Sequence, residues 1–406
     1  MVHEKSPSIP ASPGDDESDA KEDVPTFAQP KSLFHEAVFV FVVCAAQLMT
    51  QGGLSLSIAP LQLISASFNT TPKDLTWASA AYSLTVGTFI FVSGRLGDVY
   101  GHRLLFIVGF LWFGLWSLLG GFAVWSNPRF FDCCRAFQGI GPALLLPNAV
   151  AILGRSYTPG RRKGMVFCCF GAVAPGGFIV TATFSSLLAE RVWWPWGYWI
   201  FGIACFMFAG LGFLVIPFVA QETPRKDLST WQRLDGLGAI TGVSGLILIN
   251  FAWNQAPLVG WHVPYTYVLL IVGILIMALF LYLEGKAAYP LLPRSVFKGE
   301  TGWVLGCIAA GWSSFGVLVF YYYNIFENIE GNSGLLVTAK FAGASASGAC
   351  AAVVTGLLLG RVSASIIMFV AMLAFSAGQA LLASMPIGQI YWANAFVIML
   401  VTPWGM

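Results

Sequence analysis

Long apolar segments alternate with short polar connections from residue 37 to residue 406. Each segment has about the 20 apolar residues that a helix needs to cross a bilayer. The alternation predicts an all-α polytopic membrane protein with about twelve spans, at 37–64, 75–93, 104–125, 130–153, 164–188, 196–219, 236–253, 265–283, 302–323, 335–359, 362–384 and 390–406.

The composition agrees with this pattern, because 57% of the residues are hydrophobic and 10% are charged, against roughly 25% charged in soluble domains. The chain has no basic cluster, which argues against nucleic acid as a partner. The eight cysteines all fall in apolar segments and indicate small apolar side chains, so we expect no disulfide frame, metal site or cofactor. No His, Asp, Glu and Cys cluster lies at membrane depth, and no phosphate-binding loop occurs, which argues against an enzyme or an ATP-driven pump.

The basic residues predict the orientation. The connections on one side hold 13 Lys and Arg residues and those on the other side hold 3. Positive charge favours the cytoplasmic side, so the amino terminus is expected in the cytoplasm. Residues 1–35 are rich in Ser, Pro and acidic residues and predict a disordered cytoplasmic tail.

The connection between the second and third predicted spans reads Gly94-Arg95-Leu96-Gly97-Asp98-Val99-Tyr100-Gly101-His102-Arg103. Gly94 and Gly97 share one helical face and allow another backbone to come close. Gly101 can take the positive φ of a sharp reversal. Asp98 can bind a helix N-terminus or an arginine, and Arg103 offers several donors. The alternative is an ordinary charged turn whose arginines only set topology.

The fourth predicted span carries polar groups at membrane depth, where they are costly. Arg135, Gln138 and Gly139 share one face, which we expect to line a cavity, and Asp132 can pair with Arg135. The alternative is a neutralised pair that only anchors the helix. Asn148 is a buried amide that serves either as a helix–helix hydrogen bond or as a ligand contact.

The fifth predicted span contains a proline among small residues. Pro175 removes a backbone donor and predicts a bent helix. Gly171, Gly176 and Gly177 allow close packing around it.

Two of these patterns resemble the major facilitator superfamily. In that family the loop between spans 2 and 3 is a cytoplasmic latch whose aspartate helps to hold the outward-open state. The positions that match are Gly94, Gly97, Asp98, Gly101 and Arg103, while His102 stands where a basic residue is usual. The segment Arg135 to Gly141 resembles the family's span 4 pattern, in which the arginine is implicated in proton coupling. Residues 171–177 resemble the antiporter signature in part, because Ala174 replaces a glycine.

More closely, the chain is similar to the fungal fourteen-span drug:proton antiporters, and within them to aminotriazole-resistance-type transporters. The segments that carry this similarity are 48–54, 58–60, 234–238, 290–293, 303–307 and 402–406. The resemblance implies a six-helix half at 36–220, a linker with two inserted helices at 221–300, and an incomplete second half at 301–406. Two spans would then be missing, in a fragment or a truncated gene, and we expect this chain to transport poorly.

The resemblance implies a monomeric secondary active transporter of the plasma membrane rather than the vacuole. It would export a small toxic or drug-like molecule by alternating access, coupled to protons. Gln51 stands where the related family commonly has an aspartate, and glutamine can bond a substrate but carries no proton. We therefore expect Asp132 and Arg135, with Lys340 third, to serve the proton. The alternative for Lys340 is that its ammonium group only reaches the outer interface. The alternatives are a facilitator of borate or ammonium and a truncated protein that does not transport.

Overall fold

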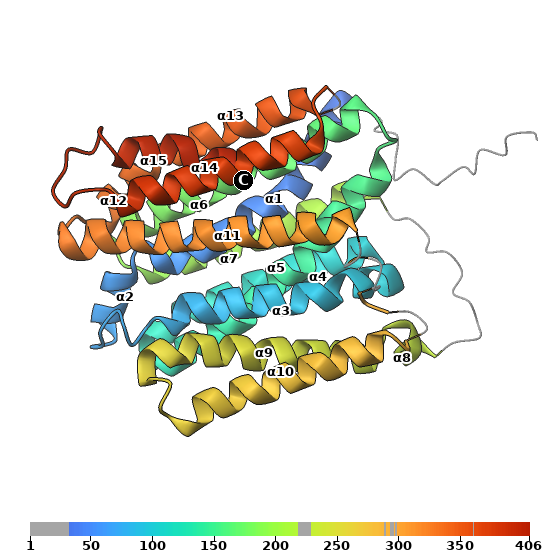
Figure 1. The fold of residues 1–406 in the computed structure, drawn as a ribbon, viewed down its shortest axis with the longest axis horizontal. Helices are drawn as coiled ribbons and strands as arrows, with labels where there is room; N and C mark the ends of the chain where they lie inside the picture. Colours follow the sequence, from blue (N-terminus) through green and yellow to red (C-terminus); the bar gives the residue numbers. More distant parts are fainter. Residues whose placement is uncertain (1–31, 218–228, 288–289, 293–295, 297–298, 360) are drawn as a thin grey trace, which may run out of the picture.

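The computed structural model describes the chain except for residues 1–31, 218–228, 288–289, 293–295, 297–298 and 360. The tail prediction therefore lies mostly outside the described residues. Residues 33–35 of this predicted tail already belong to the first helix. Ser32 caps that helix, because its side chain accepts a hydrogen bond from His35 N at 3.1 Å. Long helices lie side by side and give an almost entirely helical bundle (Figure 1).

The helices are α1 (Leu33–Ile58), α2 (Leu61–Ser67), α3 (Trp77–Tyr100), α4 (His102–Phe122), η1 (Ala123–Trp125), α5 (Pro128–Ser156), α6 (Arg161–Arg191), α7 (Pro195–Val215), α8 (Thr230–Arg233), α9 (Gly236–Val259), α10 (Pro264–Glu284), α11 (Glu300–Asn324), η3 (Ile325–Ile329), α12 (Gly334–Phe341), α13 (Gly343–Leu358), α14 (Ala364–Ala383), α15 (Ala395–Val401) and η4 (Thr402–Gly405).

Every predicted span is occupied by helix. Within the described residues, ten helical segments are long and apolar enough to cross a membrane. Helix α3 fills the second predicted span, but its many Ser, Thr and Gly residues lower its hydropathy. In the last predicted span the helix begins only at Ala395, in the shorter segment Ala395–Gly405. The first span is shorter than predicted, because Pro60 cannot donate to the helical ladder and separates α1 from α2.

The helices pack in three groups. Helices α1–α7 form the first bundle around one apolar core that includes Phe106, Phe110 and Phe131. Helices α9 and α10 form a hairpin whose α9 lies against α3. The segments from α11 to η4 form the second group, which packs on α6 of the first bundle (Figure 1).

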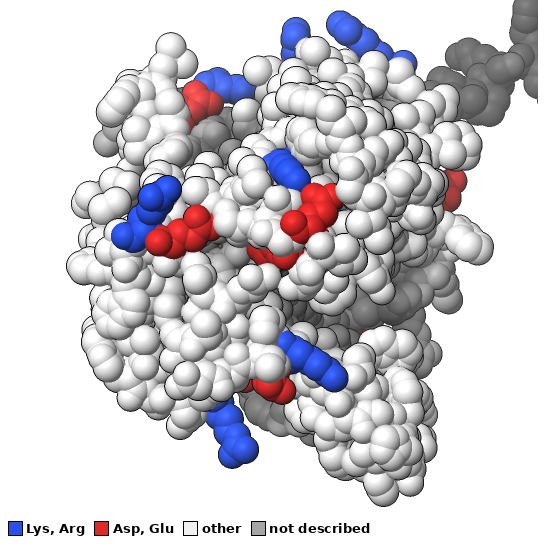
Figure 2. Space-filling view, turned by 90° about the vertical axis from the view of Figure 1, so that its left-hand side faces the viewer, with Lys and Arg blue, Asp and Glu red and all other residues white. Residues whose placement is uncertain are grey.

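The bundle has two ends that matter for function. The turn end carries the α3–α4 connection and the start of α1, and the far end carries α2 and η3 (Figure 1). Figure 2 looks at the far end, where charged side chains are few and acidic ones lie near the middle of the face.

Two hydrogen bonds join the first bundle to the second group at the far end. Gln62 Nε2 donates to Asn328 Oδ1 at 3.1 Å, and Leu335 N donates to Glu190 Oε1 at 3.1 Å. Between them, a Cβ on Gly334 would lie 2.4 Å from Ala59 O, so the two backbones touch. The two groups are therefore closed against each other at this end.

Candidate functional site

The α3–α4 connection reverses at a glycine, as the sequence predicts. Gly101 has φ +99° and its N–H bonds to Gly97 O at 2.8 Å. A Cβ on Gly97 would lie 1.9 Å from Asn148 Oδ1, so only glycine lets α5 approach here. The same expectation fails at Gly94, whose nearest neighbour would be Pro147 Cβ at an ordinary 3.8 Å.

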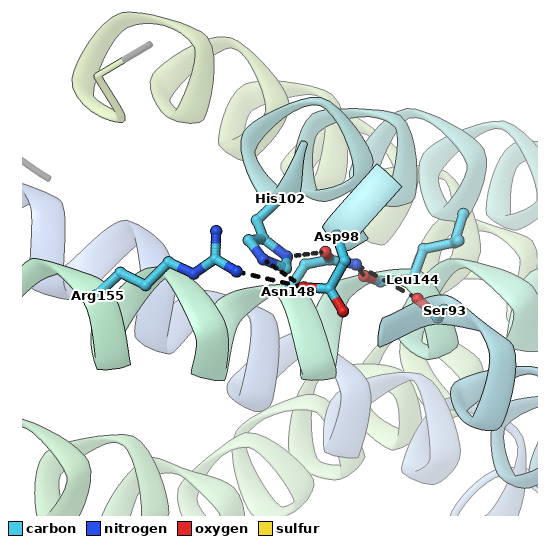
Figure 3. Close-up of polar contacts among 6 residues, drawn as sticks. All are labelled: Ser93, Asp98, His102, Leu144, Asn148 and Arg155. Carbon is cyan, nitrogen blue, oxygen red and sulfur yellow. Dashed lines mark hydrogen bonds and ion pairs between the residues drawn. The ribbon is translucent and has the colours of Figure 1, made fainter. Parts of the chain in front are cut away.

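Asp98 binds an arginine, one of the two partners that the sequence leaves open, and its role as a latch stays a prediction. Arg155 Nη2 lies 3.2 Å from Asp98 Oδ1, and His102 Nε2 lies 3.4 Å from the same oxygen (Figure 3). Asp98 lies beyond the predicted second span and is about half exposed. The contact with His102, followed by the charges of His102, Arg155 and Arg95, holds the pKa of Asp98 below its usual value against the opposing effect of partial burial.

Arg103 points elsewhere. It donates to the carbonyl of Phe213 and its guanidinium lies 5.0 Å from the centroid of that ring. Arg103 therefore ties α4 to α7 and leaves Asp98 to Arg155 and His102.

Asn148 joins this group through three hydrogen bonds (Figure 3). Its Nδ2 donates to Leu144 O at 2.7 Å and to Ser93 Oγ at 3.3 Å, and its Oδ1 lies 2.8 Å from His102 Nδ1. The side chain is fully buried. Of the two alternatives that the sequence leaves open, the structure shows the helix–helix hydrogen bond. We call Ser93, Asp98, His102, Asn148 and Arg155 the turn cluster.

A second polar group surrounds Arg135 in the core of the first bundle. Arg135 is 0% exposed. Its Nε donates to Ala78 O at 2.8 Å, and its Nη2 donates to Gly53 O at 2.8 Å and to Ser57 Oγ at 3.1 Å. The expectation of a cavity-facing guanidinium is therefore wrong: backbone carbonyls of α1 and α3 surround it instead.

Aromatic and amide side chains complete the surroundings of Arg135. We call Ser57, Tyr82, Ser117, Arg135 and Gln138 the arginine cluster. The Tyr82 ring centroid lies 4.6 Å from Arg135 Cζ, a favourable cation–π distance. Gln138 accepts from Arg135 Nη1 and donates through Nε2 to Ser117 Oγ at 2.7 Å. Gly139 makes room for α3, because its Cβ would lie 2.4 Å from Tyr82 O.

The predicted pair between Asp132 and Arg135 is wrong. The two side chains form no ion pair, and Asp132 Oδ1 is buried without a hydrogen-bond partner. The spacing allows the contact, but the guanidinium is bound by groups of α1 and α3.

Asn148 lies thirteen residues beyond Arg135 along α5, or about 20 Å away, so it belongs to the turn cluster and not with Arg135. Gln51 is partly buried, and its side chain makes no hydrogen bond within the described residues.

Pro175 lies inside the continuous helix α6, and the predicted bend stays a prediction. A Cβ on Gly177 would lie 2.2 Å from Leu48 O, so this glycine allows α1 to pack closely, as expected. Gly171 and Gly176 face open space, where the expectation of close packing fails. Pro175 itself touches the second group, since a Cβ on Gly348 would lie 2.8 Å from Pro175 Cγ.

Three features of the site do not follow from the sequence. His102 stands there only as a residue of the turn, and nothing connects Asn148 with that turn. The third is Glu190, whose carboxylate crosses to the second group at the far end. A lone carboxylate or amide carries no signal for a partner that lies far away in the chain.

Comparison with known proteins identifies the family. The model of the Major Facilitator Superfamily matches residues 41–406. The chain is 56% identical over 382 residues to the low affinity ammonium transporter of Saccharomyces cerevisiae, covering 93% of this chain and 74% of that protein. It is 47% identical over 383 residues to efflux pump terJ of Aspergillus terreus, covering 93% and 73%. It is 33% identical over 382 residues to the aminotriazole resistance protein of Saccharomyces cerevisiae, covering 93% and 70%.

Among solved structures, a peptide transporter of the POT type superposes with a TM-score of 0.59 at 15% identity, covering 93% of this chain and 82% of that one. At this identity the likeness shows the fold alone. The predicted similarity to fungal efflux and aminotriazole-resistance transporters is confirmed by the relatives. The chain thus belongs to the major facilitator superfamily and is a transporter of that family.

Proposed function

We propose that this protein is a secondary active transporter that moves a small molecule by alternating access between the first bundle and the second group. The observation that carries the proposal is the closed far end, where two hydrogen bonds and one backbone contact hold the two groups together. The two groups also share an apolar core that includes Phe178 of α6 and Tyr322 and Phe341 of the second group. Opening this end therefore separates packed apolar surfaces together with a few polar contacts, as a rocking motion between two packed groups does.

We propose that the turn end faces the cytoplasm, because the excess of basic residues lies in the connections on that side. We further propose that the protein lies in the plasma membrane, with the far end outside. The turn cluster then acts at the cytoplasmic ends of α3, α4 and α5. Its contacts lie within the first bundle, so it fixes these three helices to one another while the two groups move. One chain contains both groups, and we propose that the monomer is the working unit.

Proton coupling is supported by Asp132. This carboxyl lies in the first turns of α5, near the far end, and its Oδ1 is buried without a partner. A buried carboxylate oxygen without a partner is unfavourable, so Asp132 is the group that we propose to bind the proton. Arg135, whose donors are taken up by neighbours in the core, serves to position α1, α3 and α5.

For the substrate we propose a small toxic or drug-like organic molecule that is exported. The similarity to efflux pump terJ and to the aminotriazole resistance protein supports this class. The second candidate is ammonium, supported by the 56% identity to the low affinity ammonium transporter. The two candidates differ in whether transport depends on a proton gradient. A neutral drug can leave the cell against its own concentration gradient only when its movement is coupled to an ion that moves down its gradient.

Flux through proteoliposomes tests both candidates. Aminotriazole and methylammonium are offered separately to vesicles with and without a proton gradient, and an ionophore that collapses the gradient is the control. Saturable, gradient-dependent aminotriazole movement supports coupled export. Saturable methylammonium movement without a gradient supports the second candidate. If neither compound moves faster than in protein-free vesicles, the proposed function is wrong.

A further inference from the structure

We propose that the carboxylate of Glu327 takes over the N-terminus of α12 from Glu190 when the far end opens. In the closed far end, Glu190 Oε1 of the first bundle accepts a hydrogen bond from Leu335 N at 3.1 Å. This N–H belongs to the first turn of α12, in the second group, so separation of the two groups breaks the bond. The inference rests on the proposed function, because it concerns the open state of the far end.

The N-terminus of α12 needs acceptors in both states. The first N–H groups of a helix have no partner within the helix, and carboxylates are favoured there. Ser333 satisfies one of them, because its Oγ accepts from Leu336 N at 3.3 Å. The acceptor for Leu335 N is Glu190, which comes from the other group. Opening the far end therefore leaves Leu335 N in need of a new acceptor.

Glu327 lies beside the same turn and belongs to the second group. Its Oε1 is buried and makes no hydrogen bond within the described residues. A Cβ on Gly334 would lie 3.3 Å from this oxygen, and Gly334 directly precedes Leu335. A buried carboxylate oxygen without a partner is unfavourable. Glu327 thus has an unused acceptor next to the N–H that Glu190 occupies.

Groups of the first bundle crowd this turn in the closed state. The same Cβ on Gly334 would collide with Ala59 O, so this carbonyl touches the start of α12. Ala59 caps the end of α1, and Glu190 lies in the last turn of α6. Both residues move away with the first bundle, and their departure clears the N-terminus of α12 for Glu327.

A wide helical turn holds Glu327 in place. In η3 the backbone bonds span five residues instead of four, since Glu330 N donates to Ile325 O at 3.0 Å. Asn332 N then donates to Phe326 O at 3.0 Å and leads the chain back to α12. Such wide turns are rare and often occur at functional sites. Because these bonds lie within the second group, Glu327 stays beside α12 when the two groups separate.

The exchange gives the two acids opposite effects. The bond of Glu190 exists only in the closed state, and the bond of Glu327 would exist only in the open state. Removal of Glu190 should therefore favour opening, and removal of Glu327 should favour closure. The two side chains also lie close enough for their charges to interact. Plain repulsion between two carboxylates would instead make both substitutions favour the closed state.

Distances between spin labels on the full chain in lipid nanodiscs test the inference. Labels are attached to Leu63→Cys on α2 and Ile387→Cys in the α14–α15 connection, both exposed, after replacement of the eight native cysteines by alanine. Pulsed electron paramagnetic resonance then gives the ratio of open to closed molecules. We expect Glu327→Ala to lower this ratio about tenfold, the size of one helix-cap hydrogen bond, and Glu190→Ala to raise it by a similar factor.

Glu330→Gln is the matched control. The carboxylate of Glu330 binds Lys340 at 3.2 Å and Asn332 at 3.0 Å, both in the second group, so its loss should leave the ratio unchanged. Glu327→Gln, which keeps the size of the side chain and one acceptor oxygen, should lie between Glu327→Ala and the wild type.

The possible outcomes separate the inference from the proposed function. A ratio that stays unchanged in Glu327→Ala and Glu327→Gln, or that falls in Glu190→Ala as well, overturns the inference while the far end still opens. The expected shifts in a protein that does not transport support the inference and contradict the proposed function. A far end that stays closed in every protein contradicts both.

Discussion

A methyl group added at Gly97 tests the packing of the turn cluster. In Gly97→Ala the new Cβ would lie 1.9 Å from Asn148 Oδ1 and 2.4 Å from His102 Nδ1. Both neighbours are buried and Asn148 is held by three hydrogen bonds, so neither can swing aside. Overpacking costs about 1–3 kcal/mol, and loss of the bond between the ring and the amide adds about 1 kcal/mol.

The matched variant is Gly94→Ala, one helical turn earlier. Its nearest neighbour would be Pro147 Cβ at 3.8 Å, which is ordinary contact. Alanine is favoured over glycine within a helix by about 0.5–1 kcal/mol, a gain that both variants share. We therefore expect Gly97→Ala to be about 2–4 kcal/mol less stable than Gly94→Ala.

The free energy of unfolding of both variants can be measured by titration with sodium dodecyl sulfate in mixed micelles, with tryptophan fluorescence as the signal. Equal stabilities would show that α5 does not approach α3 at Gly97, and the geometry of the turn cluster would be wrong. A Gly97→Ala protein that folds but transports slowly would also place the cluster in the transport cycle.

Three further variants test other parts of the account. Arg135→Ala should destabilise the protein by about 3–5 kcal/mol, because it removes a buried charge on which several carbonyls depend; expression and unfolding at the wild-type level would contradict the arginine cluster. Gly177→Ala should weaken the packing of α1 on α6 by about 1–3 kcal/mol, since its Cβ would lie 2.2 Å from Leu48 O, whereas Gly176→Ala faces open space and should not. Asp98→Asn should change stability by less than about 1 kcal/mol, because its ion pair is half exposed, yet slow transport two- to fivefold; an unchanged rate would separate the turn from the cycle.

The membrane helices could be predicted from the sequence because a bilayer demands about 20 apolar residues in a row. The turn could be predicted in part. A sharp reversal of the chain needs a residue with a positive φ, which Gly101 can adopt, and the carboxylate of Asp98 favours a basic partner. The identity of that partner could not, because Arg155 lies 57 residues away in the chain and meets Asp98 only when α5 packs against α3.

The error at Arg135 has a different cause. Spacing along one helix makes Asp132 a possible partner, but the backbone carbonyls of Ala78 and Gly53 lie closer to the donors of the guanidinium. Such carbonyls leave no mark in the sequence. The contacts of His102 could not be predicted for a similar reason, because Asn148 lies 46 residues further along the chain.

The most direct test of alternating access is a reversible lock at the far end. Gln62→Cys and Asn328→Cys are introduced together in a background whose eight native cysteines are replaced by alanine. A reducible bis-methanethiosulfonate cross-linker then joins the two cysteines, because a hydrogen bond between two long side chains spans more than a direct disulfide can. We predict that transport falls to the level of protein-free vesicles on cross-linking and returns on reduction. Transport at an undiminished rate through the locked protein would contradict it.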